Sequence, residues 1–264
     1  MNNMRNIPDV LRARGYRLYL ADGRRLVDLW LNGGAAILGH TPQNLLRELK
    51  NTASRGLYAP FPHFTEGRYL KSLLKLFPGF SFRFYAAPPQ ELTALFNSGA
   101  VKLWRPYENP EKPLSVNDSP FFIPILPGVQ TWRDGLPLGL CVVAAKTGSA
   151  QEKDLLAQLP QNDALSPILF AVAARGVYDI LAAKERANPK LPQVAKTLKN
   201  TSSIWQRQGI YLSLKKKTSS QEWETLFNQF LEAGFLLPPT QNYPLILPGE
   251  LSDGEEAKLL ECIC

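Results

Sequence analysis

Residues 15–30 read GYRLYLADGRRLVDLW, and this pattern predicts a β-hairpin. The first half alternates apolar and polar residues, as a strand with one buried face does. Asp22-Gly23 supplies a turn that tolerates positive φ, and residues 26–30 return as a second apolar run. Because a two-stranded hairpin is marginal in water, we expect it to need a partner from elsewhere in the chain.

The C-terminal quarter of the sequence supplies candidate partners for the hairpin. Residues 210–214 alternate as a strand, and Ser219-x-x-Glu222 is a capping box for a helix that Gly234 closes. A second box, Ser252-x-x-Glu255, begins the last helix, expected over 252–261. We therefore expect the hairpin, this strand and these helices to form one helix-covered sheet.

The middle of the chain alternates helix and strand patterns, which favours an α/β fold. We expect helices over 42–49, 65–77, 90–104 and 166–184, and strands over 82–84 and 138–145. Asn97-Ser98-Gly99 weakens the third helix. Six prolines fall within 106–127, and we interpret this segment as an ordered connector without helix or central strand.

Composition narrows the functional classes. The 264 residues are 45% hydrophobic and 20% charged, as in ordinary globular proteins. The net charge is +7, but the longest basic run is Lys215-Lys216-Lys217, so we expect no nucleic-acid partner. Three scattered cysteines indicate a reducing compartment, and no targeting or membrane-spanning segment is visible. We expect a cytoplasmic protein with no membrane partner and no metal site.

Near the start of the chain, residues 15–30 are followed by Gly33-Gly34 and by Leu38-Gly39-His40-Thr41-Pro42. These stretches and residues 232–243 resemble the first and the final segments of class III aminotransferases, a family that includes glutamate-1-semialdehyde aminomutases. In between, Asn97-Ser98-Gly99 resembles a loop that holds cofactor phosphate, and residues 135–139 resemble the loop after the cofactor lysine. Residues 166–171 resemble the start of the long helix beyond that loop.

The resemblance implies a reduced fold type I pyridoxal-phosphate (PLP) transferase architecture. It would have an abbreviated large domain and a small α/β domain built from both termini. We expect an N-terminal segment over 1–80, the abbreviated large domain over 81–200 and the C-terminal small domain over 201–264. The family's active sites lie between two subunits, so the resemblance also implies a homodimer.

The sequence departs from the family where the cofactor reacts. Counting back from Gly135, the position of the lysine is held by Gln130, or by Arg133 or Asp134 if a gap is allowed. Neither an amide nor a guanidinium forms an aldimine. The span that should bind the ring is short, and its only carboxylates are Glu108, Glu111 and Asp118. We therefore expect no catalytic residue and no cofactor, and a remnant cleft lined by Ser98, Gly99, Trp132 and Gly135.

Three functions stay open at this stage. The first is a degenerate, non-catalytic aminotransferase-like protein that acts as a scaffold, a regulator or a non-catalytic subunit. The second is an active PLP-dependent aminotransferase or aminomutase that uses a relocated lysine, for which Lys102 and Lys146 are the nearest candidates. The third is a protein that binds a small-molecule ligand in the remnant cleft. His40 and His63, the two histidines, fit structural roles in turns better than catalysis.

Overall fold

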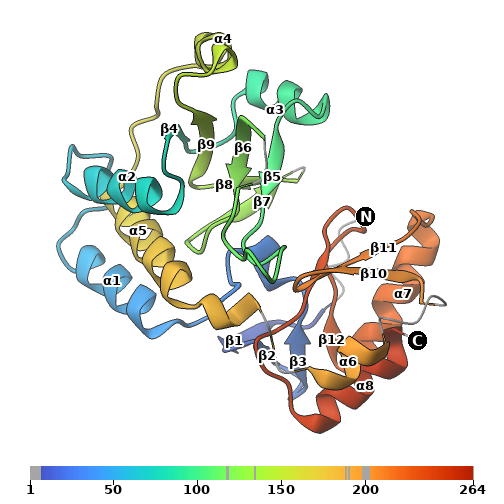
Figure 1. Ribbon diagram of the computed structural model, residues 1–264. Helices are drawn as coiled ribbons and strands as arrows, with labels where there is room; N and C mark the ends of the chain where they lie inside the picture. The colour runs from blue at the N-terminus through green and yellow to red at the C-terminus, as the bar shows by residue number, and fades with distance from the viewer. Residues whose placement is uncertain are drawn as a thin grey trace. The chain divides into compact units, whose positions relative to one another are not determined.

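The computed structural model describes residues 7–116, 119–133, 135–187, 189, 191–197 and 203–263 (Figure 1). They form two compact units, each assembled from separate stretches of the chain. The first unit combines residues from Met1–Thr41, Tyr107–Pro113 and Glu185–Cys264, and the second combines Pro42–Pro106 with Leu114–Lys184. The boundaries of these units differ from those of the three expected segments. The helices within residues 42–80 pack on α5 (Pro167–Ala182), so they belong to the second unit with it.

The predicted hairpin lies at the centre of the main sheet of the first unit. Strands β2 (Arg17–Leu20) and β3 (Arg25–Asp28) pair antiparallel around a turn in which Gly23 has φ +85°. β1 (Val10–Arg14), which the pattern did not predict, pairs with the outer side of β2. β12 (Phe235–Leu236) lies parallel to β3 on its other side. The missing partner of the hairpin thus comes from the far end of the chain, and the small α/β domain built from both termini is confirmed.

A second sheet and the helices α6, α7 and α8 also belong to the first unit. The sheet has the order β10 (Trp205–Gln208), β11 (Tyr211–Leu214) and β13 (Leu245–Ile246). The helices are α6 (Pro192–Thr197), α7 (Ser220–Ala233) and α8 (Asp253–Ile263). Both predicted capping boxes are present, and Gly234 ends α7 in the left-handed conformation with φ +96°. α7 buries Trp223, Phe227 and Phe230 on one face.

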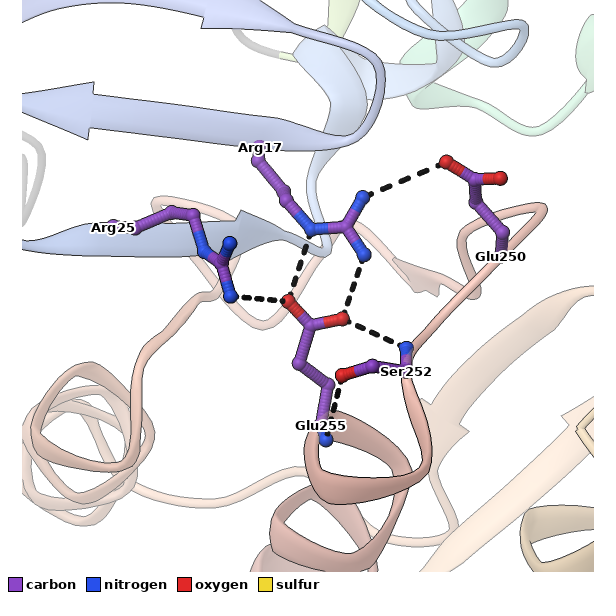
Figure 2. Close-up of polar contacts among 5 residues, drawn as sticks. All are labelled: Arg17, Arg25, Glu250, Ser252 and Glu255. Atoms are coloured by element: carbon purple, nitrogen blue, oxygen red, sulfur yellow. Dashed lines mark hydrogen bonds and ion pairs between the residues drawn. The ribbon is translucent and has the colours of Figure 1, made fainter.

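The capping box of α8 also joins the two ends of the chain (Figure 2). Glu255 accepts hydrogen bonds from Arg17 Nε at 2.9 Å and Arg17 Nη2 at 2.6 Å, across 238 residues of sequence. Arg25 lies 3.3 Å from the same carboxylate, and Glu250 lies 3.6 Å from Arg17. This charged contact lowers the pKa of Glu255 to about 2. It fixes the first turn of α8 against the hairpin.

The second unit is a four-stranded sheet between two helical layers (Figure 1). Its strand order is β4 (Phe80–Tyr85), β9 (Cys141–Lys146), β6 (Phe121–Pro124), β5 (Lys102–Trp104), with β5 parallel to β6 and the other pairs antiparallel. One face packs on α3 (Gln90–Asn97) and α4 (Ala150–Gln158). The other packs on α2 (Thr65–Leu76) and α5 (Pro167–Ala182) through the rings of Tyr69, Phe77, Phe84, Phe122 and Phe170. α1 (Gln43–Ala53) lies beside α5.

Three expectations about the middle of the chain are wrong. The helix expected over 90–104 ends at Asn97, because Gly99 turns the chain with φ +79°, and residues 102–104 form β5. The proline-rich segment contains β6, a central strand, because Pro120 and Pro124 fall at its ends and leave the N–H groups between them free to pair. The strand expected over 138–145 is two strands, β8 (Leu136–Leu138) and β9, separated by a turn at Gly139 with φ +91°.

Among the described residues, no helix combines the length and the apolar character needed to cross a lipid bilayer.

Candidate functional site

The four predicted site residues all belong to the second unit, at the hairpin of β7 (Thr131–Arg133) and β8 and at the end of α3. Gly135 lies in the hairpin turn with φ +87°, and a Cβ there would lie 3.4 Å from Phe96 Cε1. Phe96 belongs to the last turn of α3, two residues before Ser98. Trp132 lies in β7, half-buried, opposite Pro137. The structure therefore brings the two predicted loops together through Phe96, a residue that the sequence analysis did not single out.

Ser98 and Gly99 lie at the C-terminal end of α3. Their backbone N–H groups donate to Ala94 O and Phe96 O, each at 3.0 Å, and Ser98 Oγ donates to Leu95 O at 3.0 Å. These donors are therefore already occupied. The C-terminus of a helix also carries the negative end of its dipole, whereas phosphate groups bind at helix N-termini. This segment is a helix cap in geometry and does not present N–H groups to an anion.

The N-terminus of α3 is the alternative place for an anion on this helix. It follows β4 directly, through Ala86, Ala87, Pro88 and Pro89. Pro88 and Pro89 have no backbone N–H, and the N-cap position is Pro89, whose side chain caps nothing. Ala86 N donates to the carboxylate of Asp163 at 2.8 Å. The acidic side chains of Glu91, in the first turn of α3, and of Asp163, beside Ala86, therefore make this junction a poor phosphate site.

Gln130, at the position expected for the cofactor lysine, has a structural role. Its side chain is buried, and Nε2 donates to Leu140 O at 2.8 Å, which ties the start of β7 to the turn before β9. Arg133 is exposed in β7, and Asp134 lies outside the described residues. Lys102 in β5 and Lys146 in β9 are both exposed. No lysine replaces Gln130 in the part of the hairpin that the structure describes.

The sheet beside this hairpin carries ionisable groups that stay neutral. Burial raises the pKa of Cys141 to about 12, so its thiol is protonated near neutral pH. Burial likewise raises the pKa of Tyr85 to about 12, and its hydroxyl donates to Pro160 O at 2.8 Å. Within the described ranges, no three His, Cys, Asp or Glu side chains are grouped to hold a metal ion.

The remaining candidate groups from the sequence lie elsewhere. Glu108 and Glu111 belong to the first unit, and Asp118 is outside the described residues. His40 Nε2 lies 2.8 Å from the buried carboxylate of Asp28, which also accepts the N–H groups of Trp30 and Leu31. His63 Nδ1 lies 3.1 Å from Thr65 Oγ1. Both histidines hold turns, in agreement with the structural role expected for them.

PLP chemistry needs an amine for the Schiff base, donors for the phosphate and an acid for the pyridine nitrogen. At the positions that the resemblance nominates, the described residues offer a buried amide and a helix C-terminus, and the N-terminus of the same helix follows two prolines. These residues do not fit the cofactor. We therefore derive no reaction step through it.

The architecture is nevertheless that of the PLP-dependent aminotransferases. Ornithine δ-aminotransferase of Plasmodium falciparum superposes with a TM-score of 0.66 at 11% identity, covering 97% of this chain and 91% of that one. An omega-transaminase from Sphaerobacter thermophilus gives a TM-score of 0.66 at 12% identity, covering 97% and 89%. At this identity the likeness establishes the fold alone, and it confirms the expected reduced PLP-transferase architecture.

Sequence comparisons give matches along most of the chain and a match to an enzyme over a short stretch. An uncharacterized protein of Treponema pallidum is 26% identical over 298 residues, which span 93% of this chain and 90% of the relative. A glutamate-1-semialdehyde 2,1-aminomutase of Lawsonia intracellularis is 37% identical over only 67 residues, or 25% of this chain and 16% of the enzyme. No model of a known protein family matches the chain.

Proposed function

We propose that this protein is a degenerate, non-catalytic member of the aminotransferase-like fold that acts in the cytoplasm as a scaffold, a regulator or a non-catalytic subunit. The observation that carries the proposal is Gln130, whose buried amide donates to Leu140 O where the resemblance calls for a lysine. An amide does not form an aldimine. The Gln130 amide instead has a structural role, because it donates a hydrogen bond that joins the start of β7 to the turn before β9.

The geometry around α3 supports the same proposal. The backbone N–H groups of Ser98 and Gly99 donate to carbonyl groups in the C-terminal turn of α3, and prolines precede its N-terminus. At Ser98 and Gly99 a cofactor phosphate would meet neither free N–H donors nor the positive end of the helix dipole, both of which phosphate sites use. Trp132 and Gly135 then remain as packing residues of the hairpin rather than as cofactor contacts.

The decisive experiment is a spectrum of the purified protein with and without added PLP, followed by borohydride reduction and peptide mass mapping. We expect no aldimine absorption band and only scattered, partial labelling of surface lysines. Stoichiometric labelling of one lysine, Lys102 or Lys146 above all, would overturn the proposal in favour of an active enzyme with a relocated lysine.

A Gln130→Lys variant sharpens this test, because it restores the amine without restoring the phosphate donors. We expect position 130 of the variant to stay unlabelled, so that the variant shows only the scattered, partial labelling of surface lysines that we expect of the wild-type chain. If it instead forms a reducible adduct at position 130, the cleft still binds PLP and Gln130 alone explains the loss of chemistry. An authentic class III aminotransferase treated in parallel shows that the labelling conditions work.

We also propose that the protein is a homodimer, with neither nucleic acid nor membrane as a partner. Within residues 58–74 of the second unit, five large apolar side chains are exposed, three in the loop between α1 and α2 and two on α2: Tyr58, Phe61, Phe64, Leu70 and Leu74. Exposed apolar side chains that gather in one region of the chain are typical of association sites, and a second copy would bury them.

Light scattering at micromolar concentration tests the dimer. We expect a mass of about twice 29.5 kDa for the wild-type chain and a shift toward the monomer for the double variant Phe61→Ser and Phe64→Ser. Leu11→Ser is the matched control, because Leu11 is 72% exposed on β1 of the first unit and lies outside the patch. A monomeric wild-type chain contradicts the proposal.

A further inference from the structure

Strand β1 lies at an open edge of the main sheet in the first unit. The strand order β1-β2-β3-β12 places it at one end, and no strand in the described part of the chain pairs with its outer side. Four of its five residues are exposed: Val10, Leu11, Arg12 and Arg14. Because Arg14 and Arg17 flank a two-residue turn and pair with each other, the backbone N–H and C=O groups of Ala13 point away from β2. An extended peptide alongside β1 can therefore bond to these groups.

Arginines from three neighbouring strands share one face of this sheet. Arg12 lies opposite Tyr19 and Arg14 lies opposite Arg17, and residues directly opposite on antiparallel strands have their side chains on the same face. Arg25 on β3 also lies opposite Tyr19, so it belongs to this face too. The guanidinium of Arg12 lies over the Tyr19 ring, with Cζ 4.2 Å from the ring centroid, as a shared face requires. Arg12 and Arg14 are the edge arginines of this face.

The C-terminal segment of the chain supplies carboxylates to the inner arginines of this face. Glu255 lies 2.6 Å from Arg17 and 3.3 Å from Arg25, and Glu250 lies 3.6 Å from Arg17 (Figure 2). Within the described residues, neither edge arginine forms an ion pair with a carboxylate. The face therefore binds acidic side chains at β2 and β3 and presents unpaired positive charge at β1.

We propose that β1 binds an extended acidic peptide of a partner protein, which adds a strand to the sheet and pairs its carboxylates with the edge arginines. Successive side chains of a strand point to opposite faces, so the peptide carries Asp or Glu at alternate positions. A second copy of this chain is a poor occupant, because two β1 strands side by side would bring arginines of the two copies together. The site lies within the first unit and does not depend on the proposed loss of PLP chemistry.

Fluorescence anisotropy with a labelled peptide in which glutamate alternates with threonine tests the proposal. A peptide of the same composition with contiguous glutamates and an RNA oligonucleotide of equal charge are compared at the same ionic strength. We expect saturable binding of the alternating peptide, about tenfold tighter than that of the contiguous one, because only alternate carboxylates all face the edge arginines. No saturable binding of the alternating peptide, or equally tight binding of the contiguous peptide or the RNA, overturns the proposal.

Charge variants locate the binding on the sheet. Arg12→Gln and Arg14→Gln each remove one edge arginine, and we expect each to weaken peptide binding by about two- to fivefold, as the loss of an exposed ion pair does. Arg24→Gln is the matched control, because it removes the same charge from the same unit, and Arg24 already pairs with Asp22 at 2.7 Å. We expect this control to bind as the wild-type chain does. An equal loss for Arg24→Gln would mean that net charge alone drives the binding, and it rejects the site.

Ala13→Pro tests the backbone pairing. It removes an N–H group that points away from β2, and an edge strand tolerates proline at such a position. We expect peptide binding to weaken more than about tenfold, with an unfolding midpoint close to that of the wild-type chain. Ala13→Ser keeps the N–H group and should bind normally. Unchanged binding by a folded Ala13→Pro variant rejects the added strand. If that variant fails to fold, the comparison of the alternating and contiguous peptides on the wild-type chain still decides.

Discussion

The two units of this protein are held together in different ways. The first unit joins segments that are far apart in the sequence through polar groups, such as the Glu255 carboxylate on Arg17 and the Arg186 guanidinium on Ile37 O and Leu247 O. The second unit is a sheet between two apolar layers, in which the rings of Phe77 and Phe122 and the side chains of Val143 and Ile123 pack locally. Polar joints require particular residues at particular places, whereas apolar layers tolerate exchange. We therefore expect conservative exchanges to be tolerated better in the apolar layers of the second unit than at these two polar contacts of the first.

The largest expected effect comes from removing the C-terminal partner of the hairpin. A chain that ends at Gln206 lacks β11, β12, β13, α7 and α8, so β3 loses its parallel neighbour and α7 no longer covers the sheet. We expect the first unit to lose cooperative unfolding, as measured by calorimetry and by solubility after heating. A shortened chain that stays soluble and melts as cooperatively as the whole one contradicts the architecture of the first unit.

The next effect compares one buried ring in each unit. Phe227 in α7 and Phe77 after α2 are both fully buried. The ring centroid of Phe77 lies 4.7 Å from that of Trp104 and 5.1 Å from that of Phe122. We expect Phe227→Ala and Phe77→Ala each to lower the free energy of unfolding by about 3 to 5 kcal/mol, from the lost burial and the cavity left behind. Chemical denaturation measures the loss.

Exposed positions on the same two elements are the controls for these rings. Asn228→Ala on α7 and Lys71→Ala on α2 should change stability by less than about 0.5 kcal/mol. A loss below about 1 kcal/mol for either phenylalanine would mean that its ring does not belong to a packed core.

We expect the smallest effect from removing the ion pair between Arg17 and Glu255, which joins the ends of the chain. Glu255→Gln removes a carboxylate that is 12% exposed and accepts two hydrogen bonds from Arg17, and we expect a loss of about 1 to 2 kcal/mol. Glu250→Gln is the matched control, because Glu250 lies 3.6 Å from the same arginine but is 73% exposed. We expect its effect to be a few tenths of a kcal/mol.

The pH dependence of this joint follows from the pKa of Glu255, lowered from 4.5 to about 2 mainly by the hydrogen bond from Arg17. A carboxyl with a depressed pKa stabilises the folded state above its unfolded pKa and loses that contribution as pH falls through the folded one. Wild-type stability should therefore decline more steeply than that of Glu255→Gln between pH 4.5 and about 2. Identical acid profiles would show that Glu255 does not carry this charge pair.

Local signals in the sequence predicted the first unit well. Ser219 and Glu222 lie three residues apart and cap the same helix. Both partners of the capping box are therefore visible in one short stretch of sequence. The hairpin is equally local. Neither the pairing of Phe235 with Val27 nor the contact of Glu255 with Arg17 has a local signal, because each joins residues that are neighbours only after folding.

The candidate site was predicted less well, because the same residue types serve different purposes. Ser98 and Gly99 suit a phosphate loop, but serine and glycine also end helices, and here they cap α3 at its C-terminus. From the prolines we predicted that residues 106–127 hold no central strand. Pro120 precedes β6 and Pro124 is its last residue, so the residues between them are free to pair with both neighbouring strands. The absence of lysine at Gln130 was visible in the sequence, whereas the hydrogen bond from its amide to Leu140 O was not.

The contact between Arg17 and Glu255 has a consequence for biosynthesis. The two residues are 238 positions apart, so at ordinary ribosomal rates of 5 to 20 residues per second the arginine waits on the order of 10 to 50 s for its partner. Through that interval the hairpin leaves the ribosome with its open edge and apolar face uncovered, while the second unit is completed first. The N-terminal hairpin of the nascent chain therefore lacks its parallel neighbour β12 and its contact with α8 until the C-terminal segment has been translated.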